Sequence, residues 1–173
     1  PSFANWASLH KECLRIAITN GYCFAGNAAL FGASDIRIAT KGSNIGMAGP
    51  AMIEGGGLGK FSPDDIGAVE DHLLNGVVDV LVENEEQATN IAKKILSYFQ
   101  GSVNKFDVSD QELLKNILPD DRRFSYEIRD VIKIVADLDS FIELKKGYGR
   151  SLVTGLIRIE GIAFGLLASD CKF

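Results

Sequence analysis

The 173-residue sequence is 46% hydrophobic and 24% charged, with a formal net charge of −5 and a pI near 5.1. This composition is typical of a globular protein, and the length suits one domain or one domain and part of another. The acidic balance argues against nucleic acid as a partner but leaves room for local basic sites that hold an anionic ligand. No run approaches the ~20 apolar residues of a membrane helix, so we expect no membrane partner either.

The three cysteines, Cys13, Cys23 and Cys171, lack the spacing of metal ligands. Their odd number predicts reduced thiols and an intracellular protein, in the cytoplasm or, for a eukaryotic source, the mitochondrial matrix. Cys23 lies in an apolar segment and is predicted to be a core residue. No signal peptide is visible. Because the chain starts at Pro1 with residues typical of the middle of a fold, we expect a processed chain or a fragment.

The first hundred residues alternate between predicted strands and helices, which indicates an α/β fold. The predicted strands are 14–18, 36–39, 44–48 and 75–83, and the predicted helices are 26–34, a helix that starts at Ser62, and 84–99. Ser62 provides a capping hydroxyl, and Pro63 suits the first helical position. Asn84 and Gln87 have the spacing of a capping box at the start of the clearest helix. A glycine cluster, GGGLG, occupies residues 55–59.

The later residues predict a linker, two helices and a hairpin. Residues 101–107 are polar and aperiodic, which is typical of a linker, and Ser109 with Glu112 predicts a short helix after it. Ser125 is predicted to cap a helix over 125–138. Residues 151–169 predict two strands around a Glu160-Gly161 turn. A second folding unit is therefore expected to begin near residue 140.

Hydrolytic and metal sites have little support in the sequence. The two histidines are His10, near the terminus, and His72, near the end of a predicted helix where a cation suits the dipole. Both are interpreted as structural. No Gly-x-Ser-x-Gly, Cys-His pair or phosphate-loop lysine motif is present. We therefore predict no metal site, and interpret the glycine cluster as a loop rather than a phosphate site.

The stretch GYCFAGNAALFGASDIRIAT, residues 21–40, offers a different kind of site. A strand ends near Gly21 and a helix of small residues begins near Gly26. The first amides of such a helix have no intrahelical partner, and they point outward with the positive end of the helix dipole behind them. Small side chains allow a ligand oxygen to approach, as an oxyanion hole requires. The alternative is that the small residues only let the helix pack closely on a sheet.

This stretch and the residues after it resemble the crotonase superfamily. The shared features are a glycine-rich turn, a small-residue helix, an aspartate, a strand and an Ile-Gly pair. The resemblance implies that the backbone amide at Gly26 stabilises the enolate of a CoA thioester. Ala25 and Asn27 stand where many hydratases have glycine. The two catalytic glutamates of enoyl-CoA hydratases are expected at about Ala29 and Gly49, where this chain has no acid.

The rest of the chain resembles the carboxyltransferase component, of the beta-subunit type, of biotin-dependent acyl-CoA carboxylases. The segments GPAMIEGGGLGKFSPDDIG and HLLNGVVDVLVENEEQATNIAKKILSYFQG carry this resemblance over roughly residues 14–170. Further motifs in the family's order are Pro119-Asp120-Asp121, Tyr126 to Ile132, Tyr148-Gly149, Leu152 to Gly155, and Gly161. The forms AGNAAL and GPAMIEGGGLG are most similar to the branch that includes long-chain and single-chain acyl-CoA carboxylases.

This resemblance implies a Clp protease/crotonase-like spiral of ββα units. Residues 1–100 then form the end of the N-terminal half, 101–139 a helical connector, and 140–173 the start of the C-terminal half. Tyr126 and Arg129 are expected to have a structural role near the junction of the halves. In the family, the N-terminal half of one subunit faces the C-terminal half of another. This chain is therefore expected to hold one half-site of a homo-oligomer.

The implied reaction moves a carboxyl group from carboxybiotin to the α carbon of an acyl-CoA. Biotin is carried by a partner, so the implied partners are acyl-CoA and the biotin carboxyl carrier and biotin carboxylase components. The released biotin nitrogen can take the substrate proton, which fits the absence of acids at Ala29 and Gly49. The implied catalytic residues are Gly26 and Asn27. The implied substrate-binding residues are Ala25, Gly49, Pro50, Gly55, Gly56 and Gly57.

Two other functions remain open at this stage. One is a non-catalytic crotonase-like module for binding or assembly, which binds neither acyl-CoA nor biotin. The other is an enoyl-CoA hydratase or isomerase with relocated acid-base groups. Glu54 is the acid of the glycine loop that suits this second alternative, although a loop acid is more often a surface residue.

Overall fold

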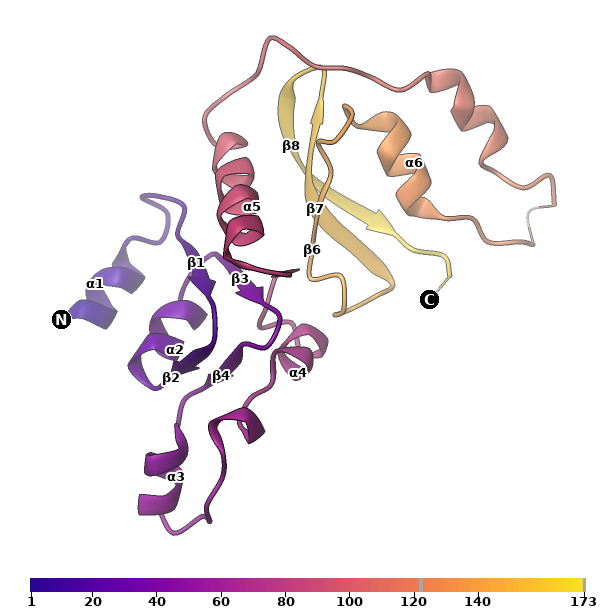
Figure 1. Cartoon of the computed structure of the whole chain (residues 1–173). Helices are drawn as coiled ribbons and strands as arrows, with labels where there is room; N and C mark the ends of the chain where they lie inside the picture. The colour runs from indigo at the N-terminus through magenta and orange to yellow at the C-terminus, as the bar shows by residue number, and fades with distance from the viewer. Residues whose placement is uncertain (122, 173) are drawn as a thin grey trace. The chain divides into compact units, whose positions relative to one another are not determined.

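The structure, a computed structural model, describes residues 1–121 and 123–172. Its internal contacts divide the chain into two compact units, Pro1–Ala92 and Lys93–Phe173 (Figure 1). The division into 1–100, 101–139 and 140–173 stays a prediction, because it concerns the halves of a larger fold. Among the described residues, no helix has the length and apolar character needed to cross a membrane.

A three-stranded parallel sheet, in the order β1-β3-β5, forms the base of the first unit. Its strands are β1 (Ile16–Thr19), β3 (Ile36–Thr40) and β5 (Val80–Val82). Branched side chains favour strands because they pack well on a pleated surface. Ile38, at the centre of β3, pairs with Ile18 on one side and Val80 on the other and is fully buried. The α/β class with a parallel sheet is therefore confirmed.

An arginine and an aspartate fix each pair of these strands in the same way. Asp35, just before β3, accepts hydrogen bonds from the backbone N–H and Nε of Arg15 at 2.9 and 3.0 Å. Asp79, just before β5, accepts from the N–H and Nε of Arg37 at 2.8 and 2.9 Å. A shift of either pair by one residue would break this set of charge-assisted bonds, so the two pairs fix the strand register.

A second, two-stranded parallel sheet lies beside the first and leads into the small-residue helix. It pairs β2 (Tyr22–Phe24) with β4 (Asn44–Gly46), and α2 (Gly26–Gly32) begins almost directly after β2. The elements share one hydrophobic cluster, formed by Cys23, Ala28, Phe31, Ala39, Ile45, Val69 and Val78. The burial of Cys23, which is 6% exposed, confirms the prediction that it is a core residue.

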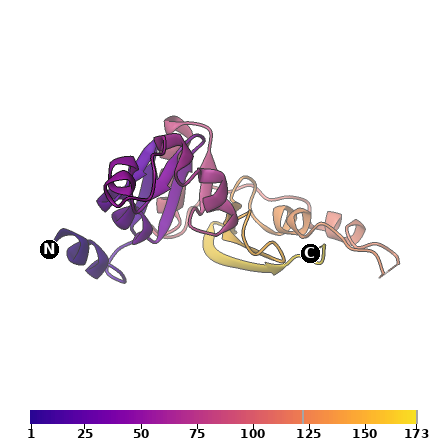
Figure 2. The ribbon, with the colours of Figure 1, turned by 90° about the horizontal axis from the view of Figure 1, so that it is seen from below.

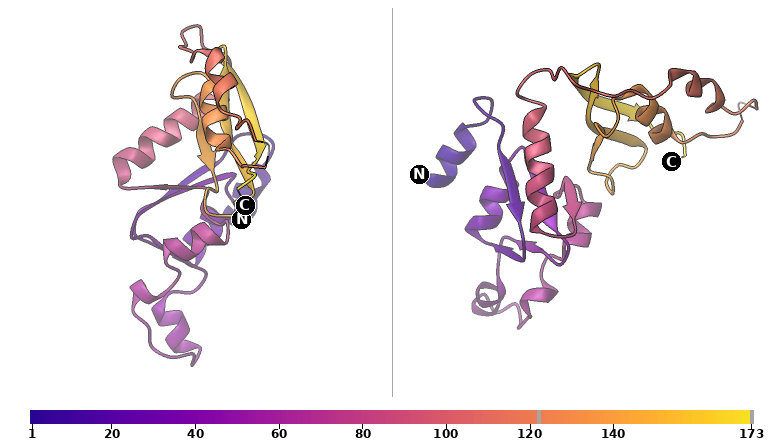
Figure 3. Two further views of the ribbon diagram at one scale, coloured as in Figure 1. Left: turned by 90° about the vertical axis from the view of Figure 1, so that its right-hand side faces the viewer. Right: turned by 45° about the horizontal axis from the view of Figure 1, so that its top comes forward.

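Further helices precede and follow these strands along the chain. They are α1 (Ser2–Ser8), α3 (Pro50–Gly55), a 3₁₀ turn (Pro63–Asp65), α4 (Val69–Leu74) and α5 (Glu85–Ser97). α1 is fixed to α2 by Trp6, whose Nε1 donates to the carbonyl of Leu30 at 3.0 Å. α3 and the glycine-rich chain after it extend away from the sheets, as Figures 1 and 3 show. The predicted cap of α5 is confirmed, because Asn84 Oδ1 accepts from the N–H of Gln87 at 3.0 Å.

The second unit is an antiparallel sheet, β6-β7-β8, with one helix packed against it. Its elements are a 3₁₀ helix (Gln111–Asn116), α6 (Ile128–Val135), β6 (Ile142–Leu144), β7 (Leu152–Ile159) and β8 (Ile162–Ser169). The predicted hairpin is confirmed, and Figure 2 shows its strong curvature. Glu160 and Gly161 both have positive φ, 51° and 77°, as a tight hairpin turn requires. Asp137 accepts hydrogen bonds from both of their N–H groups.

Several predicted boundaries in the first unit were wrong. The strand predicted over 75–83 is only Val80–Val82, because Gly76, at φ 79°, makes a turn in front of it. The helix predicted from Ser62 is a single 3₁₀ turn closed by the Ser62 and Asp65 capping box. Gly67 follows at φ 60°, and its missing side chain leaves room for the carbonyl of Ile45. α1, β2 and α3 were not predicted from the sequence.

Two predicted caps in the second unit were displaced by one or two residues. Asp110, not Ser109, caps the 3₁₀ helix by accepting from the N–H of Glu112 at 3.0 Å. Glu127, not Ser125, precedes α6 and accepts from the N–H of Arg129. In both cases an acidic side chain within two residues of the predicted hydroxyl provides the stronger acceptor for a helix N-terminus.

Candidate functional site

The turn between β2 and α2 holds its backbone in an unusual conformation. Ala25, the residue before the helix, has φ 53° and ψ −121°. These angles suit the first central residue of a type II′ turn, where glycine is favoured, and cost another residue about 1–3 kcal/mol. The N–H of Ala25 donates to the carbonyl of Gly46 at 2.9 Å, and its own carbonyl accepts from Ala29 at 3.1 Å. The turn is therefore fixed from both sides.

Two backbone donors follow this turn. The N–H groups of Gly26 and Asn27 are the first of α2 and have no intrahelical acceptor. Among the described residues, neither group donates to another backbone or side-chain acceptor. Asn27 is exposed and Gly26 is half-buried. Paired donors that lack a partner can stabilise negative charge on an oxygen that reaches them.

A cavity of about 430 Å³ lies between β1 and α2, and of the two donor residues Asn27 lines it. Asn27, Thr19, Tyr22 and Trp6 are among its lining residues. The ring of Phe3, from α1, stands 3.1 Å from the point that a Cβ on Gly26 would occupy. Phe3 and Trp6 were not predicted, because the short terminal helix that carries them has neither a side-chain cap nor a buried residue to indicate it.

The predicted substrate-binding glycines lie in two places. Gly49 precedes α3, and the ring of Phe24, the residue before Ala25, is 3.4 Å from the position of its missing Cβ. Pro50 is the first residue of α3. Gly55, Gly56 and Gly57 are at the other end of α3, which at six residues is about 9 Å long. The structure thus brings Ala25, Gly26 and Asn27 together with Gly49 nearby, and separates the last three glycines from them.

The side chains that acid-base chemistry would need are engaged elsewhere. Ala29 and Gly49, the positions of the hydratase glutamates, carry no acid. Glu54 pairs with Lys60 at 2.8 Å on the surface. His72 Nε2 lies 2.7 Å from the carbonyl of Ile45, which fixes the imidazole in a structural role. Among the described residues, no group of His, Cys, Asp or Glu side chains could hold a metal ion.

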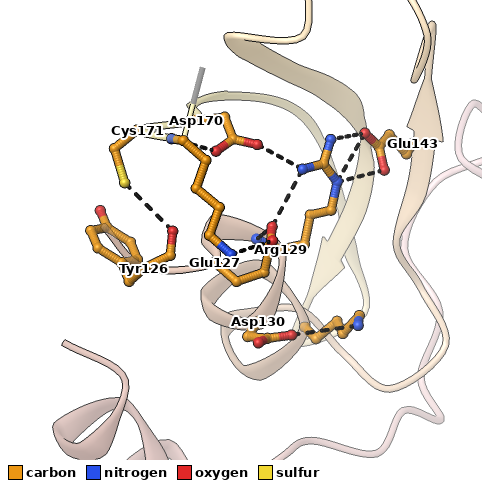
Figure 4. A network of polar contacts seen from close by, with 9 residues as sticks. Tyr126, Glu127, Arg129, Asp130, Glu143, Asp170 and Cys171 are labelled. Carbon is orange, nitrogen blue, oxygen red and sulfur yellow. Dashed lines mark hydrogen bonds and ion pairs between the residues drawn. The ribbon is translucent and has the colours of Figure 1, made fainter. Parts of the chain in front are cut away.

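Arg129 links three elements of the second unit (Figure 4). Its guanidinium contacts Glu143 of β6 at 2.6 Å and Asp170, just after β8, at 2.7 Å. It also contacts Glu127 at 3.3 Å, and Lys172 approaches Glu127 at 3.1 Å. Hydrogen bonding to Glu143 is the main cause that raises the pKa of Arg129. These contacts support the structural role expected for Arg129.

Comparison with known proteins decides the family. The carboxyl transferase domain family matches residues 2–172, which is nearly the whole chain. This chain belongs to that family. The resemblance to the carboxyltransferase component of biotin-dependent acyl-CoA carboxylases is therefore confirmed. The fold is that of the family's solved structures, with parallel α/β sheets.

Curated relatives carry the names of several acyl-CoA enzymes. The methylmalonyl-CoA carboxyltransferase 12S subunit of Propionibacterium freudenreichii subsp. shermanii is 31% identical over 97% of this chain and 34% of its own length. The mitochondrial methylcrotonoyl-CoA carboxylase beta chain of Arabidopsis thaliana is 30% identical over 90% of this chain and 29% of its own. This chain thus spans about a third of the length of these relatives.

Solved structures give the same result. A single-chain, multi-domain long-chain acyl-CoA carboxylase matches 99% of this chain at 41% identity with a TM-score of 0.97, over 18% of its own length. A transcarboxylase 12S structure, whose description names hexamer assembly and bound methylmalonyl-CoA, matches 98% of this chain and 35% of its own at 30% identity and a TM-score of 0.83.

Proposed function

We propose that this chain is part of a carboxyltransferase that moves the carboxyl group of carboxybiotin to the α carbon of an acyl-CoA. The observation that carries the proposal is the family match over residues 2–172. Two relatives are named for methylmalonyl-CoA and methylcrotonoyl-CoA, which supports a CoA thioester as the substrate class. Carboxybiotin supplies the carboxyl group and, once that group is lost, the base that takes the α proton of the acyl-CoA.

The N–H groups of Gly26 and Asn27 provide one oxyanion hole in this proposal. Loss of the α proton moves negative charge onto the thioester oxygen, and two fixed donors stabilise such charge as it develops. The conformation of Ala25 orients these donors before substrate arrives. The same two amides could instead bind the ureido oxygen of biotin. The hole therefore serves either this oxygen or the thioester oxygen of the acyl-CoA. No side-chain base is needed, which agrees with the absence of an acidic side chain at Ala29 and Gly49.

The active site is completed by parts of the enzyme that lie outside this chain. In this proposal residues 1–100 end the N-terminal crotonase-like half and residues 140–173 begin the C-terminal half, which faces the N-terminal half of another subunit. A relative assembles as a hexamer, which supports a homo-oligomer. The partners are the biotin carboxyl carrier and biotin carboxylase components. Ala25, Gly49, Pro50 and the glycines 55–57 shape the acyl-CoA pocket.

Backbone variants of the turn test this function in the protein that carries this chain. The assay follows transfer of the carboxyl group from malonyl-CoA to free biotin and measures the acetyl-CoA that forms. Asn27→Gly keeps the amide donor and most of the turnover, whereas Asn27→Pro removes the donor. Gly26→Val blocks the approach to the amide, and we expect each harmful change to lower turnover ~10²-fold or more.

The control concerns Phe3, whose ring stands where a side chain at residue 26 would go. Gly26→Val is therefore repeated in a Phe3→Ala background, which removes this collision. A folded Phe3→Ala/Gly26→Val protein with the turnover of Phe3→Ala alone would refute the oxyanion hole. Turnover of an enoyl-CoA without biotin would instead indicate a hydratase or isomerase.

A further inference from the structure

The conformation of Ala25 needs support from its surroundings. A positive φ in a residue other than glycine persists only where neighbouring contacts fix it. The immediate support is a hydrogen bond from the N–H of Ala25 to the carbonyl of Gly46 in β4. The sheet that contains this bond has only two strands of three residues each, and so short a sheet is marginal by itself. Further contacts must hold β2 against β4.

One of these contacts is aromatic. Phe24, the last residue of β2, lies against Gly46 and Gly49, with ring atoms 3.4–3.5 Å from the points where their Cβ atoms would be. The ring of Tyr22, two residues earlier on the same face of the strand, stacks on that of Phe24 at 5.8 Å between centroids and 14° between planes. The position of the Tyr22 ring therefore affects the position of Phe24, and Phe24 directly precedes Ala25.

The other end of Tyr22 is fixed by a carboxylate distant in sequence. Its hydroxyl donates to Asp64 Oδ1 at 2.7 Å, across 42 residues. This hydrogen bond is the main cause that raises the pKa of Tyr22. Asp64 is itself held in place, because Asn44 Nδ2 of β4 donates to the carbonyls of Asp64 and Ile66 at 3.2 and 2.9 Å. The contacts thus run from β2 through the 3₁₀ turn and back to β4.

We propose that Tyr22 and Asp64 are positioning residues that hold β2 on β4 and thereby fix the backbone of Ala25 and the direction of the Gly26 and Asn27 amides. The pair acts through Phe24 and the Ala25–Gly46 hydrogen bond. The importance of these amides rests on the function proposed above, whereas the clamp itself is a property of this chain. The effect of the Tyr22–Asp64 pair is local, because Arg–Asp pairs fix the other sheet, β1-β3-β5, independently.

Amide hydrogen exchange, followed residue by residue by NMR in this 173-residue chain, tests the proposal. Tyr22→Phe removes only the hydroxyl, Asp64→Ala removes the acceptor, and Asp64→Asn keeps an acceptor oxygen. We expect the first two variants to speed exchange of the Ala25 amide about 10-fold, and Asp64→Asn to stay within about 3-fold of wild type. The amide of Ile38, in the buried β3, should not change.

Two controls make the result specific. Tyr148→Phe removes the hydroxyl of an equally exposed tyrosine in the second unit, and it should leave Ala25 unchanged. Unchanged exchange at Ala25 in Tyr22→Phe would overturn the proposal, and so would equal acceleration at Ala25 and Ile38, which indicates a purely global role. Because exchange needs no substrate, failure of the oxyanion hole in the transfer assay would leave this result unaffected.

Discussion

At the scale of single residues, Ala25 is a position where sequence and backbone disagree. It holds φ 53° and ψ −121° with a side chain that makes these angles unfavourable. Ala25→Gly removes this strain but adds conformational freedom to the unfolded chain. We expect a net gain of about 1 kcal/mol in the free energy of unfolding by urea. A loss of stability instead would show that the Ala25 methyl group makes packing contacts that outweigh the strain.

The ionisation of Asp35 affects the stability of the first unit at low pH. Hydrogen bonds from Arg15 hold the pKa of this carboxyl well below its usual value of 3.8. A depressed pKa stabilises the folded state above about pH 4, and this contribution is lost as pH falls through the folded-state pKa. Asp35→Asn should therefore lower the Tm at neutral pH and weaken its fall between about pH 4 and pH 2.

Trp6 allows this change to be measured locally. It is the only tryptophan of the sequence, and its carbonyl accepts from Arg15 Nη1 at 3.0 Å. Its fluorescence should report the acid unfolding of the first unit. Asp121→Asn is the matched control, because it removes a carboxyl that pairs with Arg123 in the second unit. An identical pH dependence in Asp35→Asn and wild type would contradict the assigned role of the Arg15–Asp35 pair.

At the scale of elements, two glycines in the β7–β8 hairpin differ sharply in their surroundings. A Cβ on Gly155 of β7 would lie 2.3 Å from the carbonyl oxygen of Ile142, whereas one on Gly165 of β8 meets nothing within 4 Å. Gly155→Ala must therefore push β6 away from β7, at a cost of about 2 kcal/mol or more. Gly165→Ala should be neutral within about 0.5 kcal/mol. Urea unfolding measures both, and equal effects would contradict the predicted contact.

The elements that the sequence predicted well have strong local signals. Asn84 with Gln87 indicated the start of α5, and Glu160-Gly161 indicated the hairpin turn. β2 and α3 were missed because each is short, with three and six residues, and because their glycine-rich flanks are typical of loops. The Arg15–Asp35 and Arg37–Asp79 pairs were also missed, although Arg-Ile-Ala recurs in both strands and could have indicated them.

For the candidate site, the sequence predicted the backbone donors but not their supports. The small residues Ala25, Gly26 and Asn27 predicted an accessible helix start, and the structure leaves both amides without an acceptor among the described residues. Tyr22 and Asp64 are 42 residues apart, so no local pattern connects them. Phe3 belongs to a helix that carries no cap, and only tertiary structure places it over Gly26.

At the scale of the whole molecule, the chain consists of two units that correspond to about a third of its relatives' length. Its family was predictable because several motifs, from AGNAAL to LVTG, occur in order along the chain. Its complete active site was not, because the chain corresponds to only about a third of these relatives' length. The part of the proposed site that this chain offers for a test is the pair of Gly26 and Asn27 amides.

The most direct measurement is an NMR titration of this chain with acetyl-CoA, read at the Gly26 and Asn27 amides. We predict that both resonances shift and saturate together, and that free CoA, which lacks the thioester oxygen, leaves them in place. Circular dichroism confirms that the chain is folded. If neither acetyl-CoA nor biotin moves these two amides in the folded chain, then this chain does not contain the proposed half-site.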